Sequence, residues 1–286
     1  MIVLSSENNA TVFGDEEGDF YYQQIYRTQS FGRMNHYHRT YEIYYLLSGQ
    51  RSYFVADRAY HIAAGDLIFI NKQIVHKSSD LGPPEHERIV INFSDAFLGT
   101  NHPLYDPLLF RVFEDNAVIR LDPSERLHIQ NLLGRIASEI TEQTTGYTTY
   151  VRLLLMELLL FAARRMERNQ TAEHESASPV HQKITDVVKY INDHFQEKLS
   201  LSHLSNKFFI SPYYLSRSFK AVTGFALTEY VNLTRIKEAQ RLLRETDGKV
   251  IDIAQRVGFE NAGHFDRIFK KITQTTPLSY RKIYSF

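Results

Sequence analysis

Hydrophobic residues in the first part of the chain occur in short runs that are separated by turn-forming residues. The runs cover residues 41–47, 51–55, 67–70 and 88–93, and aromatic and β-branched side chains dominate them. Gly, Asp, Asn or Pro lies between one run and the next. Short strands at this spacing are typical of a sandwich or a barrel. The pattern therefore predicts a β-domain over about residues 20–120.

The hydrophobic period changes to a helical one after these runs. Apolar side chains recur at three- and four-residue steps in two stretches that flank Gly146. This spacing predicts helices at about residues 124–142 and 147–168. Both helices carry more apolar surface than a small barrel can cover, so we expect them to pair two subunits. On this hypothesis, a polar substitution at Leu133 or Ile136 gives a monomer.

A polar segment without periodicity follows the second of these helices. Residues 169–181 have the composition of a linker and include a proline. Apolar residues then recur at helical spacing from Ile184 to Phe195, which predicts a new amphipathic helix. We therefore divide the chain into a domain of residues 1–168, a linker, and a domain of residues 182–286.

The last hundred residues contain the same helix–turn–helix pattern twice. Leu215 and Phe219 correspond to Phe265 and Phe269, at an offset of fifty residues. Before the turn the offset is forty-nine, so the second copy has one extra residue in its turn. Two such units in one chain can place two recognition helices side by side on one face of DNA.

The first recognition helix is predicted to begin at Ser211 and Pro212 and to end at Gly224. Serine caps free backbone N–H groups, proline fits the first helical position, and glycine adopts the left-handed conformation that ends helices. Residues at the front of the helix can contact base edges, and a lysine near its end can contact phosphate. The outward-facing candidates are Tyr213, Ser216, Arg217 and Lys220.

The second recognition helix has Gly258 in its turn and Asn261 as the expected N-cap. Its face is chemically thin, because Ala262 and Gly263 have no side chain that forms hydrogen bonds. Asp266 must accept from a cytosine amine, pair with a neighbouring Arg, or point away from DNA. We therefore expect the first helix to carry most of the sequence discrimination. The candidates here are Asn261, Ala262, Gly263, His264, Arg267, Lys270 and Lys271.

Charge is distributed unevenly along a chain that is neutral as a whole. Residues 182–286 contain 17 basic and 10 acidic residues, whereas residues 1–181 contain 16 and 23. This asymmetry is expected when one domain contacts phosphate groups, although a charge-segregated enzyme would also show it. Cysteine is absent, which excludes disulfides and thiolate metal sites. No secretory signal or membrane-spanning run is visible, so we expect a soluble, cytoplasmic protein.

The sharpest polar pattern in the β-domain is His36, His38 and Glu42, with His76 further along the chain. Two histidines at positions i and i+2 of a strand point to the same face, and Glu42 can join them there. Three histidines and a carboxylate are also a ligand set for Zn, Fe, Mn or Ni.

Residues 182–286 resemble the DNA-binding domain of the AraC/XylS family of bacterial transcription regulators. The resemblance implies seven helices, with a long helix at about residues 227–244 between the two helix–turn–helix units. It also implies base contacts by Tyr213, Ser216 and Arg217 in the first unit and by Ala262, Gly263 and Arg267 in the second, where Ala262 and Gly263 replace polar residues that are often found. The segments that carry it are Leu-Ser-Arg-Ser-Phe-Lys at 215–220, Ala-Gln-Arg-Leu-Leu at 239–243, Ile-Ala-Gln-Arg-Val-Gly-Phe at 253–259 and Phe-Asp-Arg-Ile-Phe-Lys-Lys at 265–271.

The β-domain resembles a cupin. Residues 36–49 match the first cupin motif, His-x-His-x3-Glu-x6-Gly, in full, whereas Asn71 and Gln73 stand where the second motif usually has proline and glycine. Three interpretations stay open: a metal site formed by His36, His38, Glu42 and His76, a metal-free site for a small molecule, and polar residues without a ligand. The attached DNA-binding domain favours a sensor, as in AraC-type regulators, and a mono- or oligosaccharide as its effector.

A sugar site would use hydrogen-bonding side chains and an aromatic face. Tyr44 shares a strand face with Glu42, whereas Tyr45 should face away. Arg88 shares a strand face with Asn92 and can donate hydrogen bonds to a sugar. In the alternative interpretation, Arg88 is a surface residue that pairs with Glu85 or Glu87. The candidate effector residues are His36, His38, Glu42, Tyr44, His76, Arg88 and Asn92.

These observations predict a two-domain α+β protein. A cupin-like β-barrel with two dimerisation helices, at about residues 124–168, precedes an all-α double helix–turn–helix domain. We expect a dimeric bacterial regulator that binds double-stranded operator DNA and, as an activator, contacts RNA polymerase. Neither enzymatic activity nor a cofactor is expected, and a divalent metal is the alternative.

Overall fold

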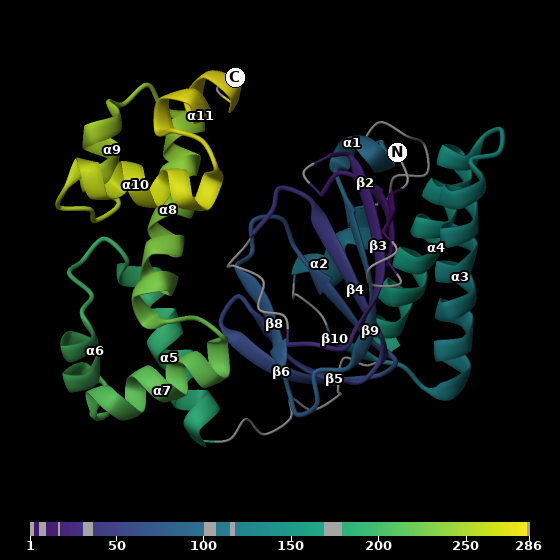
Figure 1. The fold of residues 1–286 in the computed structure, drawn as a ribbon, viewed down its shortest axis with the longest axis horizontal. Helices are drawn as coiled ribbons and strands as arrows, with labels where there is room; N and C mark the ends of the chain where they lie inside the picture. Colours follow the sequence, from purple (N-terminus) through teal and green to yellow (C-terminus); the bar gives the residue numbers. More distant parts are fainter. Residues whose placement is uncertain are drawn as a thin grey trace.

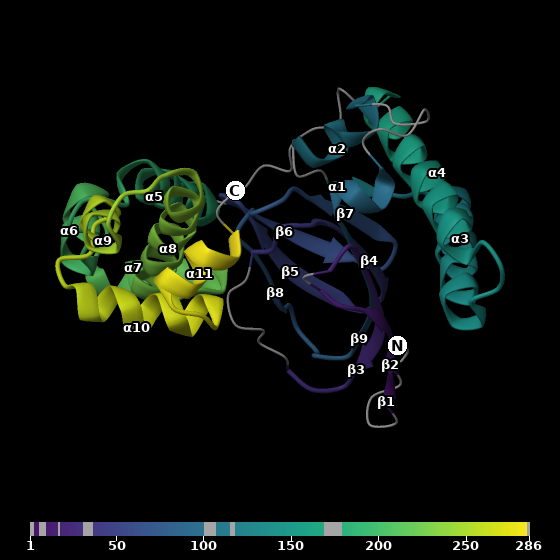
Figure 2. The ribbon, with the colours of Figure 1, turned by 90° about the horizontal axis from the view of Figure 1, so that it is seen from above.

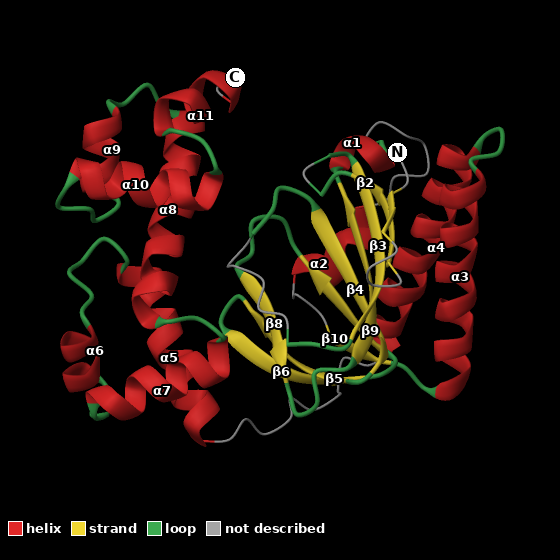
Figure 3. Ribbon diagram, viewed as in Figure 1, coloured by secondary structure: helices red, strands yellow, loops and turns green. Residues whose placement is uncertain are grey.

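The computed structural model describes residues 3–5, 10–16, 18–30, 37–99, 107–114, 118–168 and 179–284. Figure 1 shows an N-terminal domain of strands and helices beside a C-terminal helical domain. The described strands all belong to the N-terminal domain (Figure 3). This is the predicted two-domain α+β arrangement.

Two antiparallel sheets form the β-part of the N-terminal domain. The predicted runs of strand correspond to β4, β5, β7 and β9, and the remaining strands were not predicted. Among the described strands, the two sheets are not joined by hydrogen bonds into the predicted closed barrel, because β5, β6 and β8 pair only with one another. The larger sheet has the order β1 (Val3–Ser5), β2 (Ala10–Gly14), β3 (Phe20–Arg27), β9 (His86–Phe93), β4 (Tyr41–Ser48), β7 (Asp66–Ile70) and β10 (Val118–Arg120), and the smaller has the order β6 (Arg58–Ala63), β5 (Gln50–Val55) and β8 (His76–Asp80).

Strand β4 separates two environments. Ile43 and Tyr45 belong to the core that the larger sheet shares with helices, and the Tyr45 hydroxyl accepts a hydrogen bond of 3.1 Å from Gln130 Nε2. Tyr44 packs on the opposite face, where its ring centroid lies 4.8 Å from that of Tyr53 in the smaller sheet. The prediction that Tyr44 and Tyr45 face opposite sides is confirmed.

Helices α3 (Pro123–Glu142) and α4 (Tyr147–Arg168) match the two predicted helices closely. They lie on one side of the β-sheets, and the C-terminal domain lies on the other (Figures 1 and 2). The prediction that a polar substitution at Leu133 or Ile136 gives a monomer was wrong. Both side chains are buried within the chain, at 1% and 0% exposure, so they are not available to a second subunit. The apolar side chains that these helices leave exposed are Leu127, Tyr150, Leu153 and Leu160.

Three short helices cover the remaining edge of this core. Buried residues from each of them join the cluster that the larger sheet shares with α3 and α4. Their bounds are α1 (Asp95–Leu98), η1 (Pro107–Phe110) and α2 (Arg111–Glu114).

Seven helices make up the described part of the C-terminal domain, as the resemblance implied. The first begins at Pro179, so the last three residues of the predicted linker are helical; residues 169–178 lie outside the described residues. The long α8 contributes to the hydrophobic cores of both halves of the domain. The helices are α5 (Pro179–His194), α6 (Leu201–Lys207), α7 (Pro212–Thr223), α8 (Leu227–Glu245), α9 (Val250–Arg256), α10 (Ala262–Thr273) and α11 (Pro277–Tyr284).

The two helix–turn–helix units differ in their turns as predicted. Four residues separate α6 from α7, and five separate α9 from α10. Both turns need a left-handed residue, which is Phe209 (φ 53°) in the first unit and Gly258 (φ 94°) in the second. Across the described residues, no helix is long and apolar enough to cross a membrane.

Candidate functional site

Helix α7 presents the predicted polar face to solvent. The Ser211 side chain accepts a hydrogen bond of 3.3 Å from the Tyr214 backbone N–H at the start of the helix, and Gly224 (φ 76°) ends it. Leu215 and Phe219 are fully buried beneath it. Tyr213 is 76% exposed. The predicted contact residues are all exposed: Tyr213, Ser216, Arg217 and Lys220.

Helix α10 repeats this arrangement with a plainer surface. The Asn261 side chain accepts a hydrogen bond of 2.9 Å from the His264 backbone N–H, which is the predicted cap. The His264 ring packs edge-on against Phe259, with 5.6 Å between the centroids. The candidates that remain exposed are Ala262, Gly263, His264, Arg267, Lys270 and Lys271.

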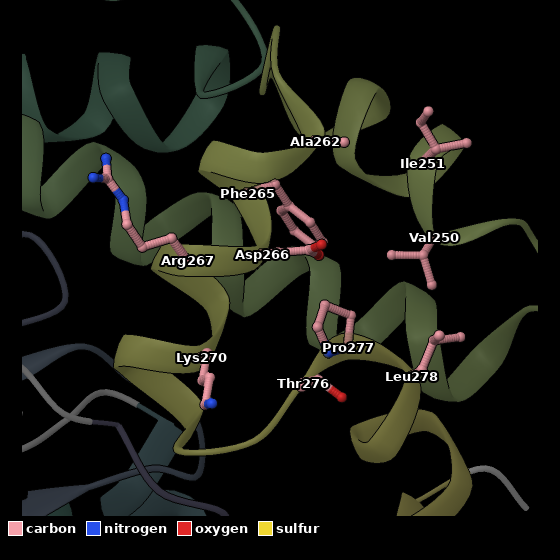
Figure 4. A pocket seen from close by; sticks show the side chains of 10 residues that line it. All are labelled: Val250, Ile251, Ala262, Phe265, Asp266, Arg267, Lys270, Thr276, Pro277 and Leu278. Carbon is pink, nitrogen blue, oxygen red and sulfur yellow. The ribbon is translucent and has the colours of Figure 1, made fainter.

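A pocket of about 580 Å³ lies beside α10, between α9 and the start of α11. In Figure 4 the Asp266 side chain points toward this pocket and Pro277, whereas Arg267 extends away from it. Of the three alternatives for Asp266, pairing with the neighbouring Arg267 is not supported, because the two side chains point in different directions. The rest of the lining is Val250, Ile251, Ala262, Phe265, Lys270, Thr276 and Leu278.

The N-terminal domain brings His38, Glu42 and His76 together between its two sheets. The His38 Nε2 atom lies 2.9 Å from Glu42 Oε2, and His76 Nε2 lies 3.5 Å from the same oxygen. One ligand atom from each residue falls within 4.8 Å of the others, which is a spacing that suits a metal ion. His36, the remaining predicted member, lies outside the described residues.

Tyr53 completes this group, and the sequence did not indicate it. Its hydroxyl donates a hydrogen bond of 2.8 Å to Glu42 Oε1. Strand β5, which carries Tyr53, pairs with β8, which begins at His76, and this pairing closes the group from the side of the smaller sheet. His38, Glu42, Tyr53 and His76 are called the Glu42 cluster below.

Glu42 is a carboxylate despite its burial. Burial raises the pKa of a carboxyl group, but the charge of His76 and the hydrogen bond from His38 hold the pKa of Glu42 well below its ordinary value. Burial lowers the pKa of His38, and the hydrogen bond and charge of Glu42 outweigh it, so this pKa is raised. Burial and then Glu42 raise the pKa of Tyr53 well above its ordinary value, which keeps the phenol as a donor.

Arg88, Asn92 and Tyr44 extend the polar interior beside this cluster, and Asn92 is the cross-strand partner of Glu42. The Arg88 guanidinium lies 5.7 Å from the centre of the Tyr44 ring and donates a hydrogen bond of 3.1 Å to Gln23 Oε1. Arg88 is 7% exposed, so the surface ion pair with Glu85 or Glu87 was the wrong alternative. Within the described residues, the buried Arg88 Nε and Asn92 Oδ1 atoms have no hydrogen-bond partner.

Arg51 is a further buried polar residue that the sequence analysis missed. It is 1% exposed, donates a hydrogen bond of 3.0 Å to Ser78 Oγ, and pairs with Asp80. Both partners lie on β8, beside β5, so a cross-strand pair satisfies this buried charge. The sequence indicated only that Arg51 lies in a predicted strand, on the same face as Tyr53 and Val55.

Comparison with known proteins agrees with this two-part arrangement. Residues 18–159 match the family profile described as an AraC-like ligand binding domain, and residues 204–283 match one described as a helix-turn-helix domain. The chain belongs to the AraC family of helix–turn–helix transcription regulators.

The relatives of this AraC-family chain share parts of it. An uncharacterized HTH-type transcriptional regulator of Staphylococcus aureus is 34% identical over 157 residues, which is 54% of this chain and 20% of that protein. The bifunctional transcriptional activator/DNA repair enzyme AdaA of Bacillus subtilis is 36% identical over 111 residues, which is 37% of this chain and 53% of that protein. The chain thus spans about a fifth of the length of the staphylococcal relative.

Two of the solved structures that match this chain are a Listeria innocua protein and ToxT. A Listeria innocua protein of unknown function is 38% identical, covers 36% of this AraC-family chain and 97% of its own, and has a TM-score of 0.35. Apo ToxT from Vibrio cholerae is 16% identical, with 95% of this chain and 100% of its own covered and a TM-score of 0.40.

Proposed function

We propose that this AraC-family chain is a transcription regulator that binds operator DNA through α7 and α10 and responds to a small polar molecule. The observation that carries the DNA-binding part is the repeated unit itself. In each copy the recognition helix is capped at its start by a side chain, anchored by a buried Phe (Phe219 or Phe269) and exposed along its polar face. Two unrelated solvated helices would not be expected to share a side-chain cap and a buried Phe at corresponding positions.

The DNA-binding proposal has a direct test. The full chain would select sequences from a pool of random duplexes, and the enriched duplex would be titrated by fluorescence anisotropy. We expect a marked sequence preference, because both recognition helices offer groups that can read base edges. Equal affinity for the selected and scrambled duplexes would contradict the proposal.

The effector is proposed to bind between the two sheets, and a sugar fits the groups that are present there. Glu42 accepts hydrogen bonds, and Arg88 Nε and Asn92 Oδ1 are buried without a partner among the described residues. Tyr44 is the aromatic side chain beside them, with its ring centre 5.7 Å from the Arg88 guanidinium. A buried polar atom without a partner is unfavourable unless a ligand or water satisfies it. No chemistry on the ligand is proposed.

A metal ion at the Glu42 cluster is the second candidate, and the convergence of His38, Glu42 and His76 favours it. Two histidines and a carboxylate would hold the ion, leaving a position for a further ligand. Metal binding has to displace a proton from His38, whose pKa is raised by Glu42.

Thermal melting of the full chain separates these two candidates. The samples would contain a panel of sugars, a panel of divalent metals, or EDTA. A ligand at a hundredfold excess over its Kd adds about 2.7 kcal/mol, which raises the melting temperature by roughly 5–10 °C. A shift with one class of sugar that EDTA leaves unchanged supports the sensor. A shift with metal that EDTA reverses establishes the metal site instead.

Dimerisation through α3 and α4 completes the proposal. These helices lie on the side of the molecule opposite the C-terminal domain (Figure 1), and they leave Leu127, Leu153 and Leu160 exposed. A dimer would bring four helix–turn–helix units to DNA, and an activator of this kind would contact RNA polymerase.

A further inference from the structure

The smaller sheet lies between the Glu42 cluster and the first helix–turn–helix unit. Side chains alternate along its strands, so Tyr53 and His76 face the cluster while their neighbours Phe54 and Lys77 face outward. Phe54 and Lys77 are direct partners across the β5–β8 ladder, so they share one patch of that outer face. Figure 1 shows this sheet as the part of the N-terminal domain next to α7.

The outer face of this sheet packs on the junction between α7 and α8. The Phe54 ring lies 5.8 Å from Phe225 and 5.9 Å from Tyr230, edge-on in both cases. All three rings are at most 2% exposed. The Lys77 ammonium donates a hydrogen bond of 2.6 Å to the Gly224 carbonyl and lies 4.9 Å from the centre of the Phe225 ring. The two domains therefore meet through a desolvated aromatic contact, and not only through surface charges.

The internal repeat provides a control for this contact. Gly224 and Gln274 both end a recognition helix in the left-handed conformation, with φ 76° and φ 59°. A side chain is tolerated at this position in the second unit. In the first unit a Cβ atom would lie 2.8 Å from Ser79 Oγ and 3.0 Å from Lys77 Cδ. The first unit thus has glycine where strand β8 approaches it closely.

The Glu42 cluster holds the inner face of the same two strands. Glu42 accepts the hydrogen bond from the Tyr53 hydroxyl at 2.8 Å and lies 3.5 Å from His76 Nε2. A ligand whose hydroxyl groups bind the Glu42 oxygens competes with Tyr53 and His76 for them. Any shift of these two residues moves the adjoining peptides, which carry Phe54 and Lys77.

We propose that the sheet β6–β5–β8 couples the effector site to the first helix–turn–helix unit, and that a ligand bound to Glu42 loosens the docking of this unit. Tyr53 and His76 act as positioning residues on the inner face, and Phe54 and Lys77 hold the junction at Gly224 on the outer face. The inference rests on the proposed effector site. Because the contact is at the C-terminal end of α7, docking sets the position of the first recognition helix relative to the effector domain.

Hydrogen–deuterium exchange of the full chain tests the coupling without DNA or effector. Tyr53→Phe removes the hydrogen bond to Glu42, as a competing ligand would. We expect backbone amides of residues 224–231 to exchange about fivefold faster or more, the lower end of ordinary coupling between two sites. Tyr45→Phe is the matched control, because it removes one tyrosine hydroxyl from the same domain on the face toward α3. It should leave this segment unchanged.

Phe54→Ala shows how the segment exchanges when docking is broken, and Lys77→Met does so with less loss of packing. If neither variant raises exchange at residues 224–231, the domains are not docked and the proposal is overturned. If these variants raise it but Tyr53→Phe matches Tyr45→Phe, the effector site is not coupled and the proposal is again overturned. Since no step requires DNA or sugar, a failure here is distinct from a failure of the proposed function.

Discussion

Arg217 is the side chain whose removal best tests how the first recognition helix reads DNA. It is exposed on α7 one residue after Ser216, above the buried Leu215 and Phe219. We expect Arg217→Ala to weaken binding to the selected duplex by about 1–3 kcal/mol and to relax the preference at one base position. Anisotropy titrations against the selected duplex and its single-base variants would measure both effects.

Lys220 provides the comparison for this prediction. It lies one turn further along α7 and is expected to contact phosphate, so Lys220→Ala should weaken binding to all duplexes by a similar factor and reduce the dependence on salt. An equal loss for every duplex in the Arg217→Ala variant would show that Arg217, too, contacts only phosphate.

The residues that could be predicted are those whose role is decided by their neighbours in the chain. Ser211 and Asn261 cap their helices as expected, because capping depends on a side chain and an N–H group three residues later. Tyr53 depends on long-range pairing that places its hydroxyl on Glu42, eleven residues earlier in another sheet. Arg51 was missed for the same reason, since Ser78 and Asp80 become its partners only when β5 and β8 pair.

At the scale of the elements, the close packing of the turn after α7 against strand β8 can be tested by substitution at Gly224. Gly224→Ala should destabilise the chain by about 1–2 kcal/mol through its left-handed backbone, and further because the new Cβ lies 2.8 Å from Ser79 Oγ. Ser79→Ala removes that oxygen. The double variant should therefore recover part of the loss, and calorimetric melting of the four full chains would measure it.

This cycle distinguishes backbone strain from contact between the domains. Strain alone makes the two substitutions additive, because Ser79→Ala does not change the conformation that position 224 must adopt. Additive losses would show that strand β8 does not lie against Gly224 in solution.

Helices could be predicted from the sequence more fully than strands, for a physical reason. The apolar stripes of α3 and α4 repeat over about five turns or more, which makes the helical period clear. Strand β8 has the sequence His-Lys-Ser-Ser-Asp and no apolar residue, so it carries no hydrophobic signal. Strand β3 is buried at three consecutive positions, Phe20, Tyr21 and Tyr22, so it lacks the alternation that identifies a half-exposed strand.

At the scale of the whole molecule, an apolar stripe does not reveal what covers it. The spacing of Leu133 and Ile136 correctly indicated a helix with a buried face. That face packs inside the chain, against the larger sheet and α4, and not against a second subunit. Only the tertiary structure separates the apolar residues used by the fold from those that remain for a partner.

The residues that remain lead to a revised prediction about assembly. Leu153 and Leu160 are 45% and 38% exposed and lie two turns apart on one face of α4. We expect the double variant Leu153→Asp/Leu160→Asp to halve the mass measured by light scattering, because two buried carboxylates would be unpaired in a dimer interface. Its melting temperature at low concentration should stay close to that of the parent chain, whereas Leu133→Asp should unfold the N-terminal domain. A dimer that persists in the double variant would place the subunit interface elsewhere.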